Sequence, residues 1–355
     1  MKRSDTIQRR RPAQGFTLVE LMVGLAVGLF VSLAAISVFV STRTLQTVSS
    51  AGTRMTENAR LAMELLHKDL RSAGFLGCRS ELADPPVSLL AAGSQAFLDP
   101  AADIAGIRGS RGTGGAFLPG LNATLTALTP NANSDFISIR VPVEPLSLGL
   151  SAPMTSASGV PQIGANTAGN TIESGDIAMI ANCKASAMFQ VTEANPAVSG
   201  NLAHAVGGAF VPGNATDNFQ HVFRGDSAVY RMQTRHYYIA PGSHANTNSM
   251  WRFTFPNPAG ATNPEEVVQG IDRMLVSYGV DTNGDQTVNR YVDADGVTAW
   301  NGVVAVRLQL LSTTVRDGVT LGPQAASFAG SSVQATDRRL RTQVTEVVTL
   351  RNHAP

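Results

Sequence analysis

The chain has few charged residues, few cysteines and none of the common catalytic patterns. Only 15% of its 355 residues are charged, and two are cysteines. The six histidines are scattered without a His-x-x-x-His pair, and no Gly-x-Ser-x-Gly sequence occurs. No basic tract with interleaved aromatic residues is present, which argues against nucleic-acid binding. We therefore expect neither an enzyme nor a nucleic-acid-binding protein. The glycine-rich residues 109–115 lack the strand-to-helix context of a phosphate loop, so we expect a flexible surface loop there.

Charge is entirely absent from residues 21–40. At about 1.5 Å per residue, this apolar run spans roughly the 30 Å hydrocarbon core of a bilayer. Glu20 stands directly before the run, and a carboxylate within a membrane segment costs about 2.5–3.5 kcal/mol, so we treat it as a functional residue. Cationic residues upstream of the run predict a cytoplasmic N-terminus and an external remainder of the chain: Lys2, Arg3, Arg9, Arg10 and Arg11.

The segment around Glu20 distinguishes between several kinds of targeting signal. An ordinary secretory signal has a shorter apolar core that ends at a small-residue cleavage site. The residues expected after a twin-arginine motif are missing. The sequence Gly15-Phe16-Thr17-Leu18-Val19-Glu20 instead resembles the class III signal of type IV prepilins. That resemblance implies a cleaved leader of residues 1–15, cleavage between Gly15 and Phe16, N-methylation of Phe16, and Glu20 as the fifth mature residue. The leader carries a net charge of +4 and the whole chain a net charge of +1, so the mature chain would carry −3.

Proline is absent between Pro12 and Pro85, and the helical signal continues beyond the apolar run. We predict one helix over residues 16–73, with a transmembrane half at 16–40 and an amphipathic periplasmic half at 41–76. Gly24, Gly28 and Ser32 form a small-xxx-small ladder that would let helices approach closely in lipid, although glycine is also simply common in membrane helices. The apolar stripe of the second half consists of Leu45, Val48, Met55, Ala59, Ala62, Leu66 and Leu70, and Gly74 and Gly77 follow it.

Beyond Cys78 the sequence alternates between loop-rich stretches and short strand-like runs. A long N-terminal helix followed by such runs predicts an α+β fold, in which the helix packs on a mainly antiparallel β domain over residues 77–355. The loops between residues 84 and 175 either carry adhesion specificity or are tolerated insertions. The strands are predicted at 136–143, 176–180, 187–192, 228–239, 251–255, 274–280, 303–311 and 344–350.

Two features of the external part have alternative interpretations. Cys78 and Cys183 would form a disulfide in an oxidising compartment, or they are two unrelated buried thiols. An acidic loop places oxygen atoms at alternate positions, which resembles the front of a calcium loop but lacks the turn glycine and the final carboxylate. The alternative is a hairpin turn whose Asn and Asp side chains bond their own backbone. The candidate calcium ligands are Asp281, Asn283, Asp285, Thr287 and Asn289.

Beyond the leader, the chain resembles the type IV pilus assembly protein W family of large minor pilins. The resemblance rests on residues 69–78, 182–185, 189–192 and 278–281, on Arg338-Arg339 and on residues 350–352. It implies a non-enzymatic minor pilin in a tip or priming complex, which requires no cofactor. The implied partners are other minor pilins, the major pilin, the prepilin peptidase/methyltransferase, the inner-membrane assembly platform and a tip adhesin. Two alternatives stay open: a minor pseudopilin of a type II secretion system, and a membrane-anchored calcium-dependent adhesin.

Overall fold

The computed structural model describes residues 15–78, 86–91, 96–99, 103–143, 147–257 and 260–353. The predicted leader, apart from Gly15, lies outside these residues, as do Asp84 and Pro85. The chain divides into two compact units, Met1–Ser50 and Ala51–Pro355.

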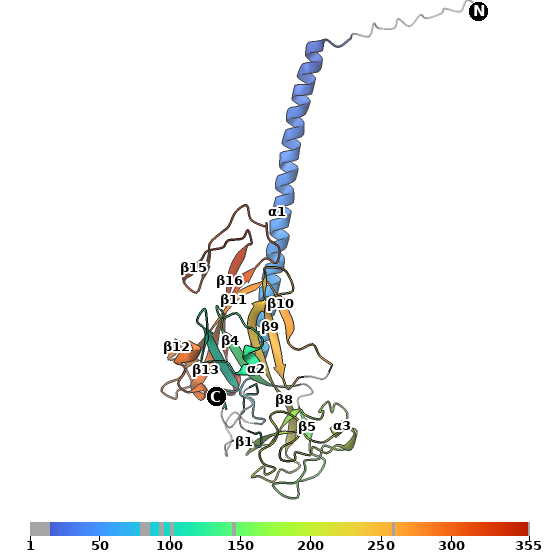
Figure 1. Cartoon of the computed structure of the whole chain (residues 1–355), viewed down its shortest axis with the longest axis vertical. Helices are drawn as coiled ribbons and strands as arrows, with labels where there is room; N and C mark the ends of the chain where they lie inside the picture. Colours follow the sequence, from blue (N-terminus) through green and yellow to red (C-terminus); the bar gives the residue numbers. More distant parts are fainter. Residues whose placement is uncertain are drawn as a thin grey trace, which may run out of the picture. The chain divides into compact units, whose positions relative to one another are not determined.

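Helix α1 (Leu18–Ser72) confirms the predicted long helix and runs through both units (Figure 1). Its apolar part is long and apolar enough to cross a membrane. Every side chain from residue 15 to residue 47 is exposed, including Leu45 of the predicted stripe. The stripe residues from Met55 onward belong to the second unit and are buried there, among them Met55, Leu66 and Leu70. The two halves of α1 therefore have different surroundings: an uncovered apolar surface first, and a packed face afterwards.

The second unit contains two larger β-sheets and a hairpin within its described residues (Figure 1). The ten-stranded sheet has the order β1-β7-β6-β8-β4-β2-β3, with β5 and β9 also paired to β8, and β10 paired to β9. Its strands are β1 (Val87–Ser88), β2 (Ile107–Gly112), β3 (Phe117–Leu118), β4 (Phe136–Pro142), β5 (Leu148–Gly149), β6 (Ile177–Ala181), β7 (Ser186–Gln190), β8 (Ala228–Pro241), β9 (Asn248–Phe255) and β10 (Glu265–Gln269).

The second sheet has the order β12-β11-β13-β16 and is antiparallel throughout. Its strands are β11 (Ile271–Val280), β12 (Arg290–Val292), β13 (Val303–Thr313) and β16 (Arg341–Thr349). The hairpin joins β14 (Ala326–Phe328) to β15 (Ser331–Val333). The short helical turns are α2 (Ala123–Thr126), α3 (Pro196–Ser199), η1 (Ala294–Gly296), η2 (Trp300–Gly302) and η3 (Arg351–His353).

The predicted α+β class and the eight predicted strands are confirmed, as β4, β6, β7, β8, β9, β11, β13 and β16. Among the strand pairs of the sheets, β1–β7 is parallel and the others are antiparallel. One hydrophobic cluster joins Leu66 and Leu70 of α1 to Ile139 and Tyr237 of the large sheet and Val306 of the small sheet. The C-terminal half of α1 is therefore part of the core of the second unit.

The expectation of a surface loop at residues 109–115 is confirmed for 113–115, which are exposed and lie outside the strands, but it is wrong for 109–112, which belong to strand β2. The glycines that suggested a loop are required by close packing. A Cβ atom on Gly109 would lie 1.9 Å from the Tyr278 hydroxyl, and one on Gly112 would lie 2.4 Å from the carbonyl oxygens of Ala132 and Ser134. Glycine here allows close approach of neighbouring groups and does not indicate mobility.

Candidate functional site

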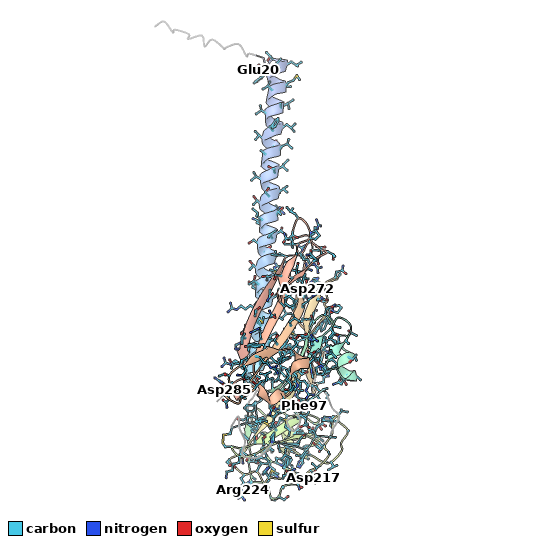
Figure 2. All side chains as sticks on the ribbon, turned by 90° about the vertical axis from the view of Figure 1, so that its left-hand side faces the viewer. Glu20, Phe97, Asp217, Arg224, Asp272 and Asp285 are labelled. Atoms are coloured by element: carbon cyan, nitrogen blue, oxygen red, sulfur yellow. A yellow bond between two sulfur atoms is a disulfide. The ribbon has the colours of Figure 1, made fainter. Side chains whose placement is uncertain are left out.

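Glu20 lies in the first turn of α1, where its carboxylate is held by Thr17 (Figure 2). The Thr17 backbone N–H and hydroxyl both donate to Oε2 of Glu20, each at 3.0 Å. The Glu20 N–H donates in return to the Thr17 hydroxyl at 3.3 Å. This reciprocal pair is a capping box, which satisfies backbone N–H groups that the start of a helix leaves unpaired. The sequence Thr-x-x-Glu at residues 17–20 is the local signal for this capping box, which we did not predict.

The geometry leaves part of the Glu20 carboxylate free for a partner. Both Thr17 bonds use Oε2, and within the described residues no group donates to Oε1. The helix N-terminus also carries a partial positive charge that favours a carboxylate at this position. Gly15 and Phe16 precede the helix, and the Phe16 side chain is fully accessible at 85% exposure. The proposed cleavage point and the proposed assembly carboxylate therefore lie within one short, accessible segment.

The predicted ladder of small residues lies on the exposed surface of the same helix. Gly24, Gly28 and Ser32 are four residues apart, which places them along one helix face. No atom lies within 4 Å of a Cβ built on either glycine, and the Ser32 hydroxyl donates to the Gly28 carbonyl at 2.8 Å. Because Ser32 satisfies its hydroxyl within its own helix, the ladder presents a flat, apolar surface. Helix packing through this ladder stays a prediction.

A buried polar joint connects α1 to the large sheet. Asp69, which is 2% exposed, accepts hydrogen bonds from the Arg235 guanidinium at 2.7 Å and the Tyr237 hydroxyl at 2.6 Å. Burial, together with the Asp69 charge, raises the pKa of Tyr237 well above its usual value, so this hydroxyl keeps its proton and donates it. In the sequence, Asp69 stands out only as the first residue of a segment that carries the family resemblance. The structure makes it a principal contact between helix and domain.

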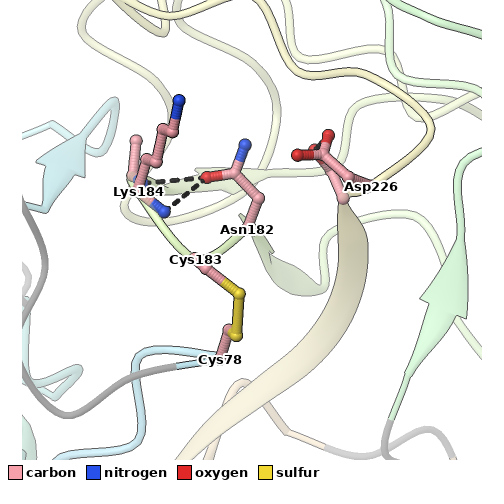
Figure 3. Close-up of a disulfide and its surroundings, with 7 residues drawn as sticks. Cys78, Asn182, Cys183, Lys184 and Asp226 are labelled. Atoms are coloured by element: carbon pink, nitrogen blue, oxygen red, sulfur yellow. Dashed lines mark hydrogen bonds between the residues drawn. A yellow bond between two sulfur atoms is a disulfide. The ribbon is translucent and has the colours of Figure 1, made fainter.

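The disulfide between Cys78 and Cys183 is confirmed (Figure 3). It joins the chain just after α1 to the turn between β6 and β7, with 4.9 Å between the two Cα atoms. Beside it, Asn182 Oδ1 accepts hydrogen bonds from the backbone N–H groups of Lys184 and Ala185, each at 2.9 Å. The bond closes a large loop of chain and attaches the end of α1 to the large sheet.

The acidic loop forms a turn in which its carboxylates bind its own backbone. The Asp281 carboxylate accepts hydrogen bonds from the backbone N–H groups of Asn283, Gly284 and Gln286 at 2.7–3.0 Å. The Asp285 carboxylate accepts hydrogen bonds from the Thr287 hydroxyl and N–H, and these bonds lower the pKa of Asp285. The Asn289 side chain bonds Thr282 in the same way. Within the described part of the chain, no three His, Cys, Asp or Glu residues are placed to hold a metal ion. The turn alternative is therefore what the structure contains, and calcium binding stays a prediction.

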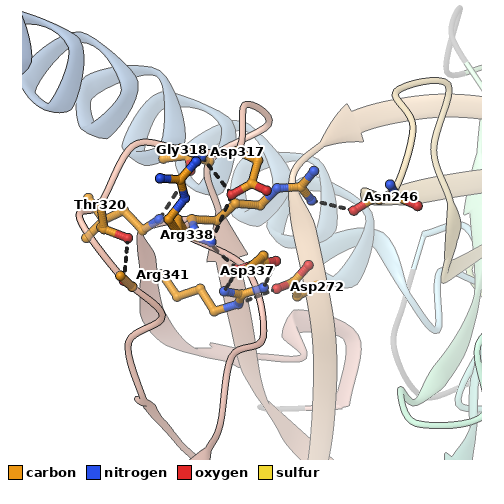
Figure 4. Close-up of polar contacts among 12 residues, drawn as sticks. Asn246, Asp272, Asp317, Gly318, Thr320, Asp337, Arg338 and Arg341 are labelled. Atoms are coloured by element: carbon orange, nitrogen blue, oxygen red, sulfur yellow. Dashed lines mark hydrogen bonds and ion pairs between the residues drawn. The ribbon is translucent and has the colours of Figure 1, made fainter.

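A second polar network fixes the chain that leads into β16 (Figure 4). Arg339, one of the residues that carried the family resemblance, is 6% exposed and donates to the backbone carbonyls of Asn246 and Ala245. Arg341 bonds Asp272 at 2.7 Å and Asp337 at 2.6 Å, and these hydrogen bonds lower the pKa of Asp337. The arginines are already engaged within the chain, so we assign them a structural role.

Comparisons with known proteins agree with these observations. Residues 236–352 match the family model of Type IV Pilus-assembly protein W, and residues 10–36 match the Prokaryotic N-terminal methylation motif. The family resemblance predicted from the sequence is thereby confirmed. No curated protein matches the chain significantly. The Type IV-like pilin TTHA1219 from Thermus thermophilus is similar at 12% identity and a TM-score of 0.32, over 85% of this chain and 99% of that one. A superposition this loose supports no conclusion about function.

Proposed function

We propose that this protein is a minor pilin that takes part in initiating and assembling type IV pili, within a complex that starts the fibre and ends at its tip. The observation that carries the proposal is Glu20, a capped carboxylate at the head of an uncharged, uncovered helix, directly behind a prepilin cleavage motif. The match of residues 236–352 to the pilus-assembly family supports a pilus-related, structural role.

The mechanism begins with the energetic cost of Glu20 in the membrane. An unpaired charge at the centre of a membrane helix costs about 2.5–3.5 kcal/mol, which is an upper bound for Glu20 at the head of the run. Thr17 occupies Oε2, and Oε1 is open to the α-amino group that cleavage after Gly15 would create on the Phe16 of a neighbouring subunit. Pairing of the two charges removes part of the cost and also sets the axial offset between subunits. One contact therefore recruits the subunit and aligns it.

Topology follows from the charges that flank the apolar run. The cationic residues upstream of Gly15 favour a cytoplasmic N-terminus, which sends the second unit, with its disulfide, to the periplasm. That unit, Ala51–Pro355, is too bulky to lie within a tightly packed shaft and instead would cap the fibre. The partners we propose are other minor pilins, the major pilin, the prepilin peptidase/methyltransferase, the assembly platform and a tip adhesin.

The test is the number of surface pili on a deletion strain in which retraction is also disabled. We expect loss or a sharp reduction, restored by the wild-type chain. A Glu20→Ala chain should be cleaved and inserted but should join the complex poorly, whereas Glu57→Ala, which removes an exposed carboxylate from the same helix, should behave as wild type. Normal pilus numbers would overturn the proposal in favour of a secretion pseudopilin or a dispensable adhesin. Unchanged co-purification of Glu20→Ala with other pilins would refute the pairing mechanism.

A further inference from the structure

Strand β16 forms an open edge of the four-stranded sheet. It pairs with β13 over nine residue pairs, from Arg341 to Thr349, without a register shift. The sheet order ends at β16, so within the described residues no strand pairs with its other side. The edge is therefore long, regular and without a β-bulge, whereas natural proteins usually keep exposed edges short, twisted or covered.

Hydrogen bonds at both ends of the strand show which backbone groups face outward. Leu340 accepts the Thr314 N–H at 3.0 Å, and Leu350 donates to the Val304 carbonyl at 2.9 Å. Both pairs continue the register of the β13–β16 ladder. Because hydrogen-bonded and non-hydrogen-bonded pairs alternate in an antiparallel ladder, the even-numbered residues of β16 bond β13. The odd-numbered residues then direct their N–H and C=O groups away from β13, and no protein group in the described part of the chain bonds them. These residues are Gln343, Thr345, Val347 and Thr349.

The side chains leave most of this edge unblocked, although the Gln343 side chain accepts a hydrogen bond from the Ala329 N–H of the β14–β15 hairpin at 3.0 Å. Residues 342–349 contain no lysine, proline or glycine. Their one charged residue, Glu346, already forms an ion pair with His67 of α1. Thr345 and Thr349 are exposed, and Val347 is 50% exposed. Lysine and proline are the residues that natural edge strands use to prevent association. Their absence here leaves a β-branched edge whose charged residues, Arg341 and Glu346, already have partners within the chain.

The direction of β16 limits what can occupy the edge. Ser312, which is paired with Thr342, bonds the Met55 carbonyl; Glu346 contacts His67; and Asn352 bonds the Ala73 carbonyl. Strand β16 therefore runs in the same direction as α1. An antiparallel pair of two β16 strands would point their α1 helices in opposite directions. Two copies anchored in one membrane with the same orientation cannot do this.

We propose that β16 accepts an extended strand from a different pilus subunit, which extends the four-stranded sheet by one strand. Backbone groups of Thr345 and Val347 would supply the hydrogen bonds, and an uncharged, β-branched partner strand fits their side chains. This proposal rests on the proposed function, because it names another subunit of the same assembly as the partner.

The test is residue-resolved hydrogen exchange of full-length protein, alone in detergent and in the subunit complex purified from a strain without pilus retraction. In the protein alone, the amides of Thr345, Val347 and Thr349 should exchange freely. In the complex they should exchange at least about tenfold more slowly, which is the effect of about one net hydrogen bond each. The amides of β13 serve as an internal control, because they are bonded in both samples.

Variants at one position separate pairing from folding. Val347→Pro removes an outward N–H without removing a bond to β13, so we expect a folded, disulfide-bonded chain that loses the added protection. Val347→Ala keeps the N–H and should retain the protection. Thr345→Lys leaves the backbone intact and adds an edge charge, and it should also abolish the protection, which keeps the test decisive where the proline variant does not fold.

Two outcomes would overturn the proposal. Protection of the same amides in the purified protein alone, rising with its concentration, would make a second copy the occupant. Exchange that stays fast in the complex, in a strain whose pili depend on this protein, would refute pairing at β16 while leaving the proposed function intact. Loss of the proposed function would be recognised separately, by normal pilus numbers on the deletion strain.

Discussion

Replacing Asp69 with alanine should loosen the attachment of α1 to the domain more than any exposed change on that helix. The substitution removes the acceptor of the Arg235 guanidinium and the Tyr237 hydroxyl, and Tyr237 has no exposure to water. Breaking one side of a buried ion pair costs about 3–5 kcal/mol, and we expect the lower end here, because the Tyr237 hydroxyl stays buried without a partner while the Arg235 guanidinium is partly exposed. In a unit of this size, that loss corresponds to a fall in melting temperature of roughly 5–10 °C.

The assay is thermal unfolding of the full-length protein in detergent, followed by circular dichroism and by protease sensitivity of α1. Glu57→Ala is the matched control, because it removes the same charge from an exposed position of the same helix and should change stability by less than about 0.5 kcal/mol. Asp69→Asn should fall between the two, since it keeps one acceptor and loses the charge. Equal melting temperatures for Asp69→Ala and Glu57→Ala would show that the joint contributes nothing to stability.

Four further predictions follow from single contacts. Replacing both Cys78 and Cys183 with serine removes a link across 105 residues and should lower the free energy of unfolding by about 4.7 kcal/mol in the chain-entropy model. A variant as stable in urea unfolding as the oxidised wild type would contradict this. Burial lowers the pKa of His236 to about 4, whereas the unfolded residue titrates near 6.5, so its contribution to stability is complete above pH 6.5 and is lost as the pH falls towards 4. Between pH 7.5 and pH 5, the free energy of unfolding should fall by about 2 kcal/mol more in wild type than in His236→Gln. Equal falls in the two proteins would refute the lowered pKa of His236. Calorimetry with millimolar calcium decides between the turn and the calcium loop: heat that Asp281→Asn removes would establish a calcium site, and the absence of heat in wild type would eliminate it. Gly28→Leu should insert normally but enter the complex poorly, whereas normal incorporation would reject the helix ladder.

The elements that the sequence predicted are those whose signal is local. An uncharged run, an absence of proline and a regular apolar stripe predict α1 almost to its ends, because they depend only on helix periodicity and on the membrane. Strands β8, β11 and β13 are rich in β-branched and aromatic residues, so their composition is also informative on its own.

The features that the sequence did not predict depend on residues far apart in the chain. Strand β2 contains two glycines and two arginines in six residues and reads as a loop until Tyr278 and β4 are placed beside it. By sequence alone Asp69 belongs to the charged side of α1, whereas in the structure Arg235 and Tyr237, more than 160 residues later, bond its carboxylate. In both cases tertiary packing overrides local preference, and no periodicity within the segment records it.

Two free energies indicate how a contact at Glu20 would act on the rest of the protein: the burial of α1 side chains and the cost of Glu20 in the membrane. On α1, four large side chains are buried against the domain: Met55, Met63, Leu66 and Leu70. At about 1.5–3 kcal/mol each, their burial contributes roughly 6–12 kcal/mol as an upper estimate, and the Asp69 joint adds to it. Placing Glu20 at the head of the membrane segment would cost at most about 2.5–3.5 kcal/mol, the figure for a charge at the helix centre. The C-terminal half of α1 is therefore held in the second unit more strongly than Glu20 is driven to find a partner, so the proposed pairing at Glu20 would not detach that half of the helix.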